Sequence, residues 1–128
     1  MEGREDSPTE ERRRSERLSC AALACSCSVR AEPSGRSYGA VLTNISAGGV
    51  CFETDLETAP GEILRIEARP IEGPEFEATI RVLHLRRSQR AGLFVVGSTF
   101  ESLTEGARRD LLILLDTVGR LQRGLSQR

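Results

Sequence analysis

Apolar and polar residues alternate in short runs over most of the first 100 positions of the chain, with the period of a β-strand. The runs cover residues 18–29, 38–45, 49–53, 63–68, 76–84 and 93–100. In the most regular run, one face holds Phe76, Ala78, Ile80, Val82 and His84. Six short strands predict a mostly β fold, an antiparallel sheet rolled into a small six-stranded barrel that closes its own edges.

Glycine and proline mark the boundaries between these strands. Turn residues stand at 32–35, 46–49, 59–62 and 73–74. In the third turn, Pro60 takes the second position, where its fixed φ fits, and Gly61 takes the third, where φ is often positive. Turns this short between strands favour antiparallel neighbours.

The period changes near residue 104, and the sequence predicts a C-terminal α-helix over 104–124. Its apolar residues recur at three- and four-residue spacing: Leu111, Leu114, Leu115, Val118, Leu121 and Leu125. Thr104 is the predicted N-cap of this helix. Leu112 and Ile113 make the apolar stripe wider than one barrel contact needs, so the helix either closes the barrel alone or also forms a homodimer.

The first residues of the chain are polar and charged. Residues 1–11 are acidic and contain a proline, which predicts a disordered lead-in. An arginine-rich arm follows at residues 12–17, with the sequence Arg-Arg-Arg-Ser-Glu-Arg. Taken alone, such a run is typical of a solvated tail that neutralises itself, and Glu16 would repel a phosphate if it faced one.

Length and charge narrow the classes of partner. A chain of 128 residues is the size of one domain, and its formal net charge of −1 gives no basic field for a nucleic-acid polymer. No apolar run approaches the roughly 20 residues that span a bilayer, so no membrane insertion is expected. The first residues lack the apolar core of a secretory signal, which predicts a cytoplasmic protein.

Few residues offer catalytic or metal-binding chemistry. Cys20, Cys25, Cys27 and Cys51 lack the spacing of a zinc knuckle and are expected to be small buried side chains. His84 is the one histidine, and its place in a strand favours a packed or solvated side chain. Without lysine, a nucleophile elbow or a Walker loop, the sequence predicts no enzyme, no cofactor and no metal.

Two motifs carry the remaining chemistry. Arg13 and Arg17 form an R-x-x-x-R pair, and residues 44–49 form an N-x-S-x-x-G turn. Guanidinium groups bind phosphate oxygens and the O6/N7 edge of guanine bidentately, and glycine lets a backbone approach a ligand closely. Together the motifs indicate a site for a phosphorylated, guanine-like ligand.

The chain resembles the PilZ domain, a bacterial receptor module for the second messenger cyclic di-GMP. The R-x-x-x-R pair before the first strand and the [D/N]-x-S-x-x-G turn after the second are both present and in order. Residues 59–64, 77–82 and 96–100 also resemble strands of that family. The resemblance covers residues 12 to 120 and implies a PilZ-type barrel with a flexible basic arm.

The resemblance also implies a set of ligand-binding residues. These are Arg12, Arg13, Arg17, Asn44, Ser46 and Gly49. The arginine pair would contact phosphate and the guanine edge, and Arg12 adds a cation that favours two stacked ligands over one. Asn44 would meet a guanine edge with both a donor and an acceptor, and Gly49 would keep the turn tight.

The expected organisation is a single stand-alone domain over residues 12–125, with the arm at 12–17, the barrel at 18–100 and the helix at 104–124. The expected function is a receptor whose arm becomes ordered over the barrel when cyclic di-GMP binds, and which then signals to a downstream protein. The alternative is a PilZ-like adaptor that binds proteins and no nucleotide. Replacing Arg13 separates them, since only the receptor would lose affinity for the nucleotide.

Overall fold

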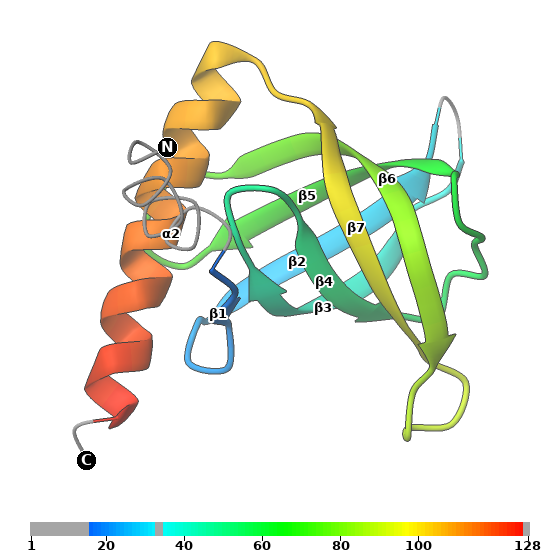
Figure 1. Cartoon of the computed structure of the whole chain (residues 1–128), viewed down its shortest axis with the longest axis horizontal. Helices are drawn as coiled ribbons and strands as arrows, with labels where there is room; N and C mark the ends of the chain where they lie inside the picture. Colours follow the sequence, from blue (N-terminus) through cyan, green and yellow to red (C-terminus); the bar gives the residue numbers. More distant parts are fainter. Residues whose placement is uncertain (1–15, 33–34, 127–128) are drawn as a thin grey trace, which may run out of the picture.

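The computed structural model describes residues 16–32 and 35–126, in seven strands and one long helix (Figure 1). The strands are β1 (Leu18–Ser19), β2 (Cys25–Ala31), β3 (Tyr38–Ile45), β4 (Val50–Thr54), β5 (Ile63–Pro70), β6 (Phe76–Arg87) and β7 (Phe94–Ser102), and the helix is α2 (Glu105–Ser126). The predicted helix over 104–124 is thus present, and it ends two residues later than expected.

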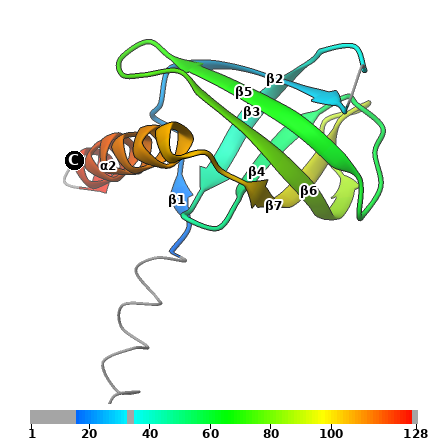
Figure 2. The ribbon, with the colours of Figure 1, turned by 90° about the horizontal axis from the view of Figure 1, so that it is seen from above.

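Six of the strands close into an antiparallel barrel, which confirms the predicted fold class. Their order around the barrel is β3, β2, β5, β6, β7 and β4, and β4 pairs back onto β3. The seventh strand, β1, lies outside the barrel and pairs with the C-terminal end of β3 (Figure 2). The helix α2 packs beside the barrel, across one of its ends (Figures 1 and 2).

The predicted first strand over residues 18–29 is interrupted in the structure. Leu18 and Ser19 pair with β3, the chain turns, and β2 begins at Cys25. The backbone N–H of Leu23 donates to the carbonyl oxygen of Cys20 at 3.0 Å, which closes this turn. The residues between Ser19 and Cys25 show no clear alternation of apolar and polar side chains. The sequence pattern therefore gives no indication of the break and predicts a single strand.

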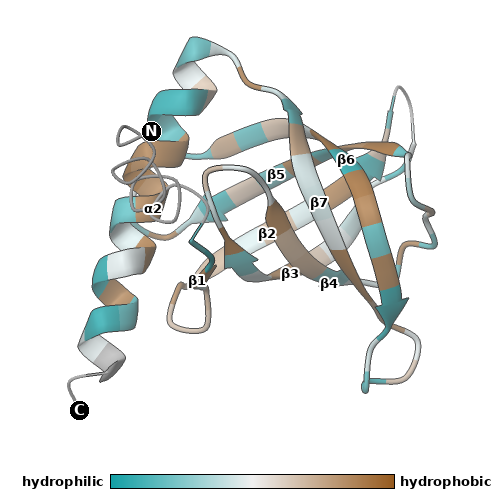
Figure 3. Ribbon diagram, viewed as in Figure 1, coloured by the Kyte–Doolittle hydropathy of each residue, from teal (hydrophilic) through white to brown (hydrophobic). Residues whose placement is uncertain are grey.

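The barrel interior confirms the predicted face of β6 up to Val82, and alternate residues of β5 are buried with it. Apolar and polar residues follow one another along β6 (Figure 3). The side chains buried from these two strands are Leu64, Ile66, Ala68, Phe76, Ala78, Ile80 and Val82. His84 is the exception, because the pairing of β6 with β7 shifts register between Val82 and His84. This bulge turns His84 to the outside of the barrel, where its side chain is exposed.

The helix α2 begins as predicted at a threonine cap. The N–H of Ala107 donates to Oγ1 of Thr104 at 3.0 Å, and Leu111, Leu114 and Val118 are buried against the barrel. Further along, α2 contacts β1, where the N–H of Ser19 donates to Oε1 of Gln122 at 2.8 Å. Within the described part of the chain, no helix is both long and apolar enough to cross a bilayer.

Candidate functional site

The pairing of β1 with β3 brings the two motifs together. Leu18 pairs with Ile45 and Ser19 with Asn44, so Arg17, the residue before β1, comes opposite Ser46. The N–H of Cys20 also donates to the carbonyl of Thr43 at 3.0 Å, which holds the chain on β3 after the strand ends. The end of the arginine arm is therefore attached beside the N-x-S-x-x-G turn.

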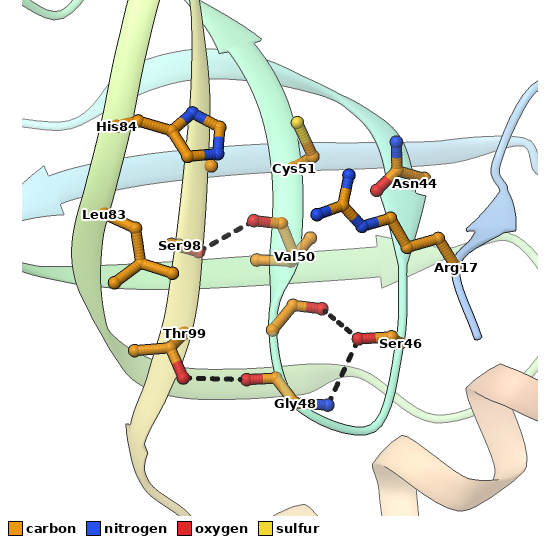
Figure 4. Close-up of a pocket in the computed structure, with 12 residues that line it drawn as sticks. Arg17, Asn44, Ser46, Gly48, Val50, Cys51, Leu83, His84, Ser98 and Thr99 are labelled. Carbon is orange, nitrogen blue, oxygen red and sulfur yellow. Dashed lines mark hydrogen bonds between the residues drawn. The ribbon is translucent and has the colours of Figure 1, made fainter. Parts of the chain in front are cut away.

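Arg17, Asn44, Ser46 and Gly49 line one pocket of about 230 Å³ (Figure 4). The side chain of Arg17 extends from the start of β1 into this pocket, toward Asn44 (Figure 4). Four of the six predicted ligand residues thus share one site. The other two, Arg12 and Arg13, lie outside the described residues.

The turn between β3 and β4 is held by its own serine. The N–H of Ser46 donates to the carbonyl of Gly49 at 2.9 Å, and the N–H of Gly48 donates to Oγ of Ser46 at 3.2 Å. The carbonyl of Gly48 accepts from the N–H of Phe100 at 2.9 Å and from Oγ1 of Thr99 at 3.0 Å. The turn is therefore fixed both internally and to β7.

Gly49 is required by the packing of this turn against β7. A Cβ at this position would lie 2.0 Å from the carbonyl oxygen of Ser98, a backbone atom that cannot move aside easily. At Gly48 the nearest atom to such a Cβ is Oγ of Ser46, at 4.0 Å. The structure thus accounts for the last glycine of the motif, while Gly48 has room for a side chain.

Asn44 is positioned by an irregularity in β3. The register between β3 and β4 shifts between Leu42 and Asn44, which leaves Thr43 as an extra residue and pairs Asn44 with Cys51. The half-buried amide of Asn44 makes no hydrogen bond to any described residue. Its NH₂ donors and carbonyl acceptor are therefore available to a ligand edge.

The floor of the pocket is a row of residues across four strands. Asn44 on β3 pairs with Cys51 on β4, Cys51 with Gly97 on β7, and Gly97 with His84 on β6. Cys51, Gly97 and His84 are not among the ligand-binding residues predicted from the sequence. No signal along the chain marks the bulge that turns His84 outward, so only the pairing register could have found it.

The electrostatics of the pocket suit an anion. The Arg17 guanidinium is exposed and forms no ion pair with any of the described residues. A larger hollow of about 410 Å³ lies between the outer face of β5 and β6 and the start of α2, but Glu75, Glu77 and Asp110 line it. Its one arginine, Arg65, is paired with Glu77 at 2.5 Å, so this second hollow would repel a phosphate.

The cysteines are free thiols, and none is exposed. Burial raises the pKa of Cys20 and of Cys27 from the ordinary 9.0 to about 12, because a thiolate loses its hydration inside the protein. Thiols of this kind are poor nucleophiles and poor metal ligands. Over residues 16–32 and 35–126, no three His, Cys, Asp or Glu side chains are grouped as a metal site.

The sequence profile of the PilZ domain matches residues 11–116. This match spans most of the chain, which therefore belongs to the PilZ domain family. A search of curated protein sequences gave no match.

Several solved structures share the fold. MotI/DgrA, the Bacillus subtilis inhibitor of motility, is 21% identical with a TM-score of 0.64, over 90% of this chain and 53% of its own. The PilZ domain of Escherichia coli YcgR with c-di-GMP is 18% identical with a TM-score of 0.64, over 91% of this chain and 98% of its own. The K. pneumonia MrkH–c-di-GMP complex is 20% identical with a TM-score of 0.70, over 88% of this chain and 55% of its own. The chain spans about half the length of MotI/DgrA and of MrkH.

Proposed function

We propose that this protein is a receptor for cyclic di-GMP, which binds in the pocket beside the N-x-S-x-x-G turn. The observation that carries the proposal is the β1–β3 pairing, which sets Arg17 opposite Ser46 and beside Asn44. Membership of the PilZ family and the c-di-GMP in the YcgR and MrkH structures support the choice of ligand.

Each group in the pocket has a chemical counterpart on such a ligand. The Arg17 fork can pair with a phosphate or with the O6/N7 edge of guanine, and the Asn44 amide can both donate to and accept from a base edge. The backbone of the fixed turn is accessible to a ligand at Gly48, because this residue has no side chain and no other atom crowds it. A guanine nucleotide can satisfy all three groups, whereas a plain phosphate has no donor for the Asn44 carbonyl oxygen.

The pocket is small for the whole ligand. Its volume of about 230 Å³ is below the roughly 300–1,000 Å³ of a typical ligand pocket. We propose that Arg12 and Arg13 supply the missing contacts, and that ligand binding orders residues 12–17 over the barrel. Arg12 provides the cation that would favour two stacked ligands, which carry four negative charges, over one.

Calorimetric titration of the full chain with cyclic di-GMP tests the receptor proposal, with GTP as the control ligand. We expect saturable binding whose molar ratio distinguishes one ligand from two. Arg17→Ala and Arg13→Ala should each weaken binding at least tenfold, since a charge-assisted contact is worth roughly 1.5–3 kcal/mol. Arg109→Ala, which removes an exposed arginine of α2 far along the chain, is the matched control and should bind normally.

Limited proteolysis tests the ordering of the arm. Saturating cyclic di-GMP should protect the bonds after Arg12, Arg13 and Arg17 from trypsin, because an ordered segment cannot enter a protease site. Tight binding with unchanged cleavage at these bonds would contradict the switch but leave the receptor intact. Absence of any binding would instead favour the adaptor function.

We propose that the signal passes to a downstream protein through an apolar surface on α2 and the β5–β6 turn. Ile71 is 80% exposed, Ile113 49% and Leu121 38%. Ile71 and Leu121 line one small hollow, and Ile113 and Leu121 line another, so these exposed apolar side chains adjoin one another. A homodimer through α2 would use part of the same surface. Sedimentation of the wild type and of Ile113→Glu tests the homodimer. If the homodimer forms, the wild type should sediment as a dimer and the variant as a monomer.

A further inference from the structure

His84 is a pocket residue that belongs to neither signature motif. It stands at the end of the row Asn44–Cys51–Gly97–His84, on the opposite side of the pocket from Arg17. The β6 bulge between Val82 and His84 is what turns it outward. A bulge next to a functional site commonly redirects one side chain toward that site. The bulge before His84 therefore suggests that this side chain contributes to the pocket.

The imidazole of His84 lies over the backbone of Gly97. A Cβ at Gly97 would be 2.3 Å from Cε1, 2.4 Å from Nε2 and 3.0 Å from Nδ1 of this ring. The ring therefore occupies the space that a side chain at residue 97 would need, and it is spread over β7 beside Cys51 (Figure 4). It makes no hydrogen bond to the described residues and remains exposed.

We propose that His84 is a ligand-contacting residue of this site and that its imidazole is the surface on which a guanine base of the ligand stacks. This inference rests on the proposed cyclic di-GMP receptor function.

The geometry of the row supports stacking. The ring lies over β7, about two strand spacings or roughly 10 Å from Asn44 on β3. Only the small Cys51 side chain lies between them along the row, so a planar base has space over the pocket floor. Histidine is one of the side chains on which unstacked bases rest in protein complexes. A base seated there keeps its edges free for Asn44 and Arg17.

Gly97 gives the proposal an indirect test. Gly97→Ala adds one methyl group that must push the imidazole out of its place, without touching any polar group of the ligand site. Gly39→Ala on β3 is its matched control, because a Cβ there meets nothing within 4 Å. If the effect of Gly97→Ala acts through the ring, it should vanish when His84 is already alanine.

Calorimetry with cyclic di-GMP separates the outcomes. His84→Ala should weaken binding roughly 5- to 100-fold, the usual loss for one base–aromatic stack, whereas His84→Phe should keep affinity within about threefold. Gly97→Ala should weaken binding, Gly39→Ala should not, and the double variant His84→Ala/Gly97→Ala should bind like His84→Ala alone. Normal binding by His84→Ala, or equal losses in the Ala and Phe variants, would overturn the stacking role.

A spectroscopic test follows from the composition, since His84 is the only histidine of the chain. Its imidazole C–H signals in the NMR spectrum are therefore unambiguous, and a guanine ring above them should shift them upfield as cyclic di-GMP is added. Unmoved signals at saturation would overturn the inference while leaving the receptor function in place. If the wild type binds no cyclic di-GMP at all, the proposed function fails and the stacking role fails with it.

Discussion

The backbone N–H of Ser19 donates a hydrogen bond to Oε1 of Gln122 at 2.8 Å, across 103 positions of the sequence. Beside it, a Cβ at Gly119 would lie 3.9 Å from Cδ1 of Leu18, so α2 also packs against the other residue of β1. These two β1 residues are the ones that place Arg17 opposite Ser46. The C-terminal helix thus supports the strand that positions the arginine of the site.

Gln122→Ala should lower the free energy of unfolding by about 0.5–1.5 kcal/mol, the usual worth of one hydrogen bond. Gln122→Glu keeps an acceptor oxygen for the Ser19 N–H and should retain most of that stability. Urea unfolding followed by circular dichroism measures both, with Arg109→Ala as an exposed control on the same helix. Equal losses in the Ala and Glu variants would show that this hydrogen bond is not the cause.

Gly49→Ala should destabilise the protein by at least about 1–3 kcal/mol, because the new methyl group overlaps the Ser98 carbonyl and the turn must move away from β7. Gly48→Ala, one residue earlier, should change stability by less than about 0.5 kcal/mol, as most surface substitutions do. Thermal unfolding of the two variants provides the comparison. Similar melting temperatures for the pair would contradict the packing argument.

Thr104→Ala should cost about 1 kcal/mol of stability, because the Ala107 N–H loses its side-chain acceptor at the start of α2. Thr104→Ser keeps the hydroxyl and should restore nearly all of it. Chemical denaturation of the three proteins checks this. A serine variant as unstable as the alanine variant would assign the loss to the threonine methyl group instead.

The buried thiol of Cys20 and the partly buried thiol of Cys27 predict a fall in stability at alkaline pH. Cys20 and Cys27 have folded-state pKa values of about 12, raised from 9.0 chiefly by burial, so the unfolded chain releases these protons first. Their contribution is complete below about pH 9 and declines as the pH rises from 9 toward 12. The double variant Cys20→Ala/Cys27→Ala should be less stable overall but show a shallower decline over that window.

Thiol labelling supplies the control for that prediction. At pH 8 in native buffer, Cys20 and Cys27 should react slowly with a maleimide, since the thiolate is the reacting form and burial disfavours it. In urea both should react at the rate of an ordinary cysteine. Rapid labelling of either residue in the folded protein would contradict the raised pKa values.

Much of the barrel could be predicted from the sequence because its strands alternate strictly. The inward face of β6 up to Val82, the turn at Pro60–Gly61 and the cap at Thr104 all follow from local residue chemistry, and the structure confirms each of them. Gly61 indeed has φ of 93°. Local preferences of this kind depend on only a few neighbouring residues, so they can be predicted from the sequence alone.

The errors occurred where pairing between strands overrode the local pattern. The break between β1 and β2 depends on which part of β3 each strand pairs with, and the outward turn of His84 depends on the register between β6 and β7. A one-residue shift moves a side chain to the other face of a sheet. Alternation along β6 alone therefore assigned His84 to the same face as Val82, whereas the structure turns it outward.

By itself, the sequence determined the composition of the candidate site: which arginines, amide, hydroxyl and glycines are available, and in what order along the chain. Only the tertiary structure decided that Arg17 comes opposite Ser46, that Asn44 stands in one row with Cys51, Gly97 and His84, and that α2 supports β1. The physical reason is that these neighbours are joined by hydrogen bonds between elements distant in the sequence, strand to strand or strand to helix. Such contacts join segments far apart along the chain, so they form only when the whole chain folds.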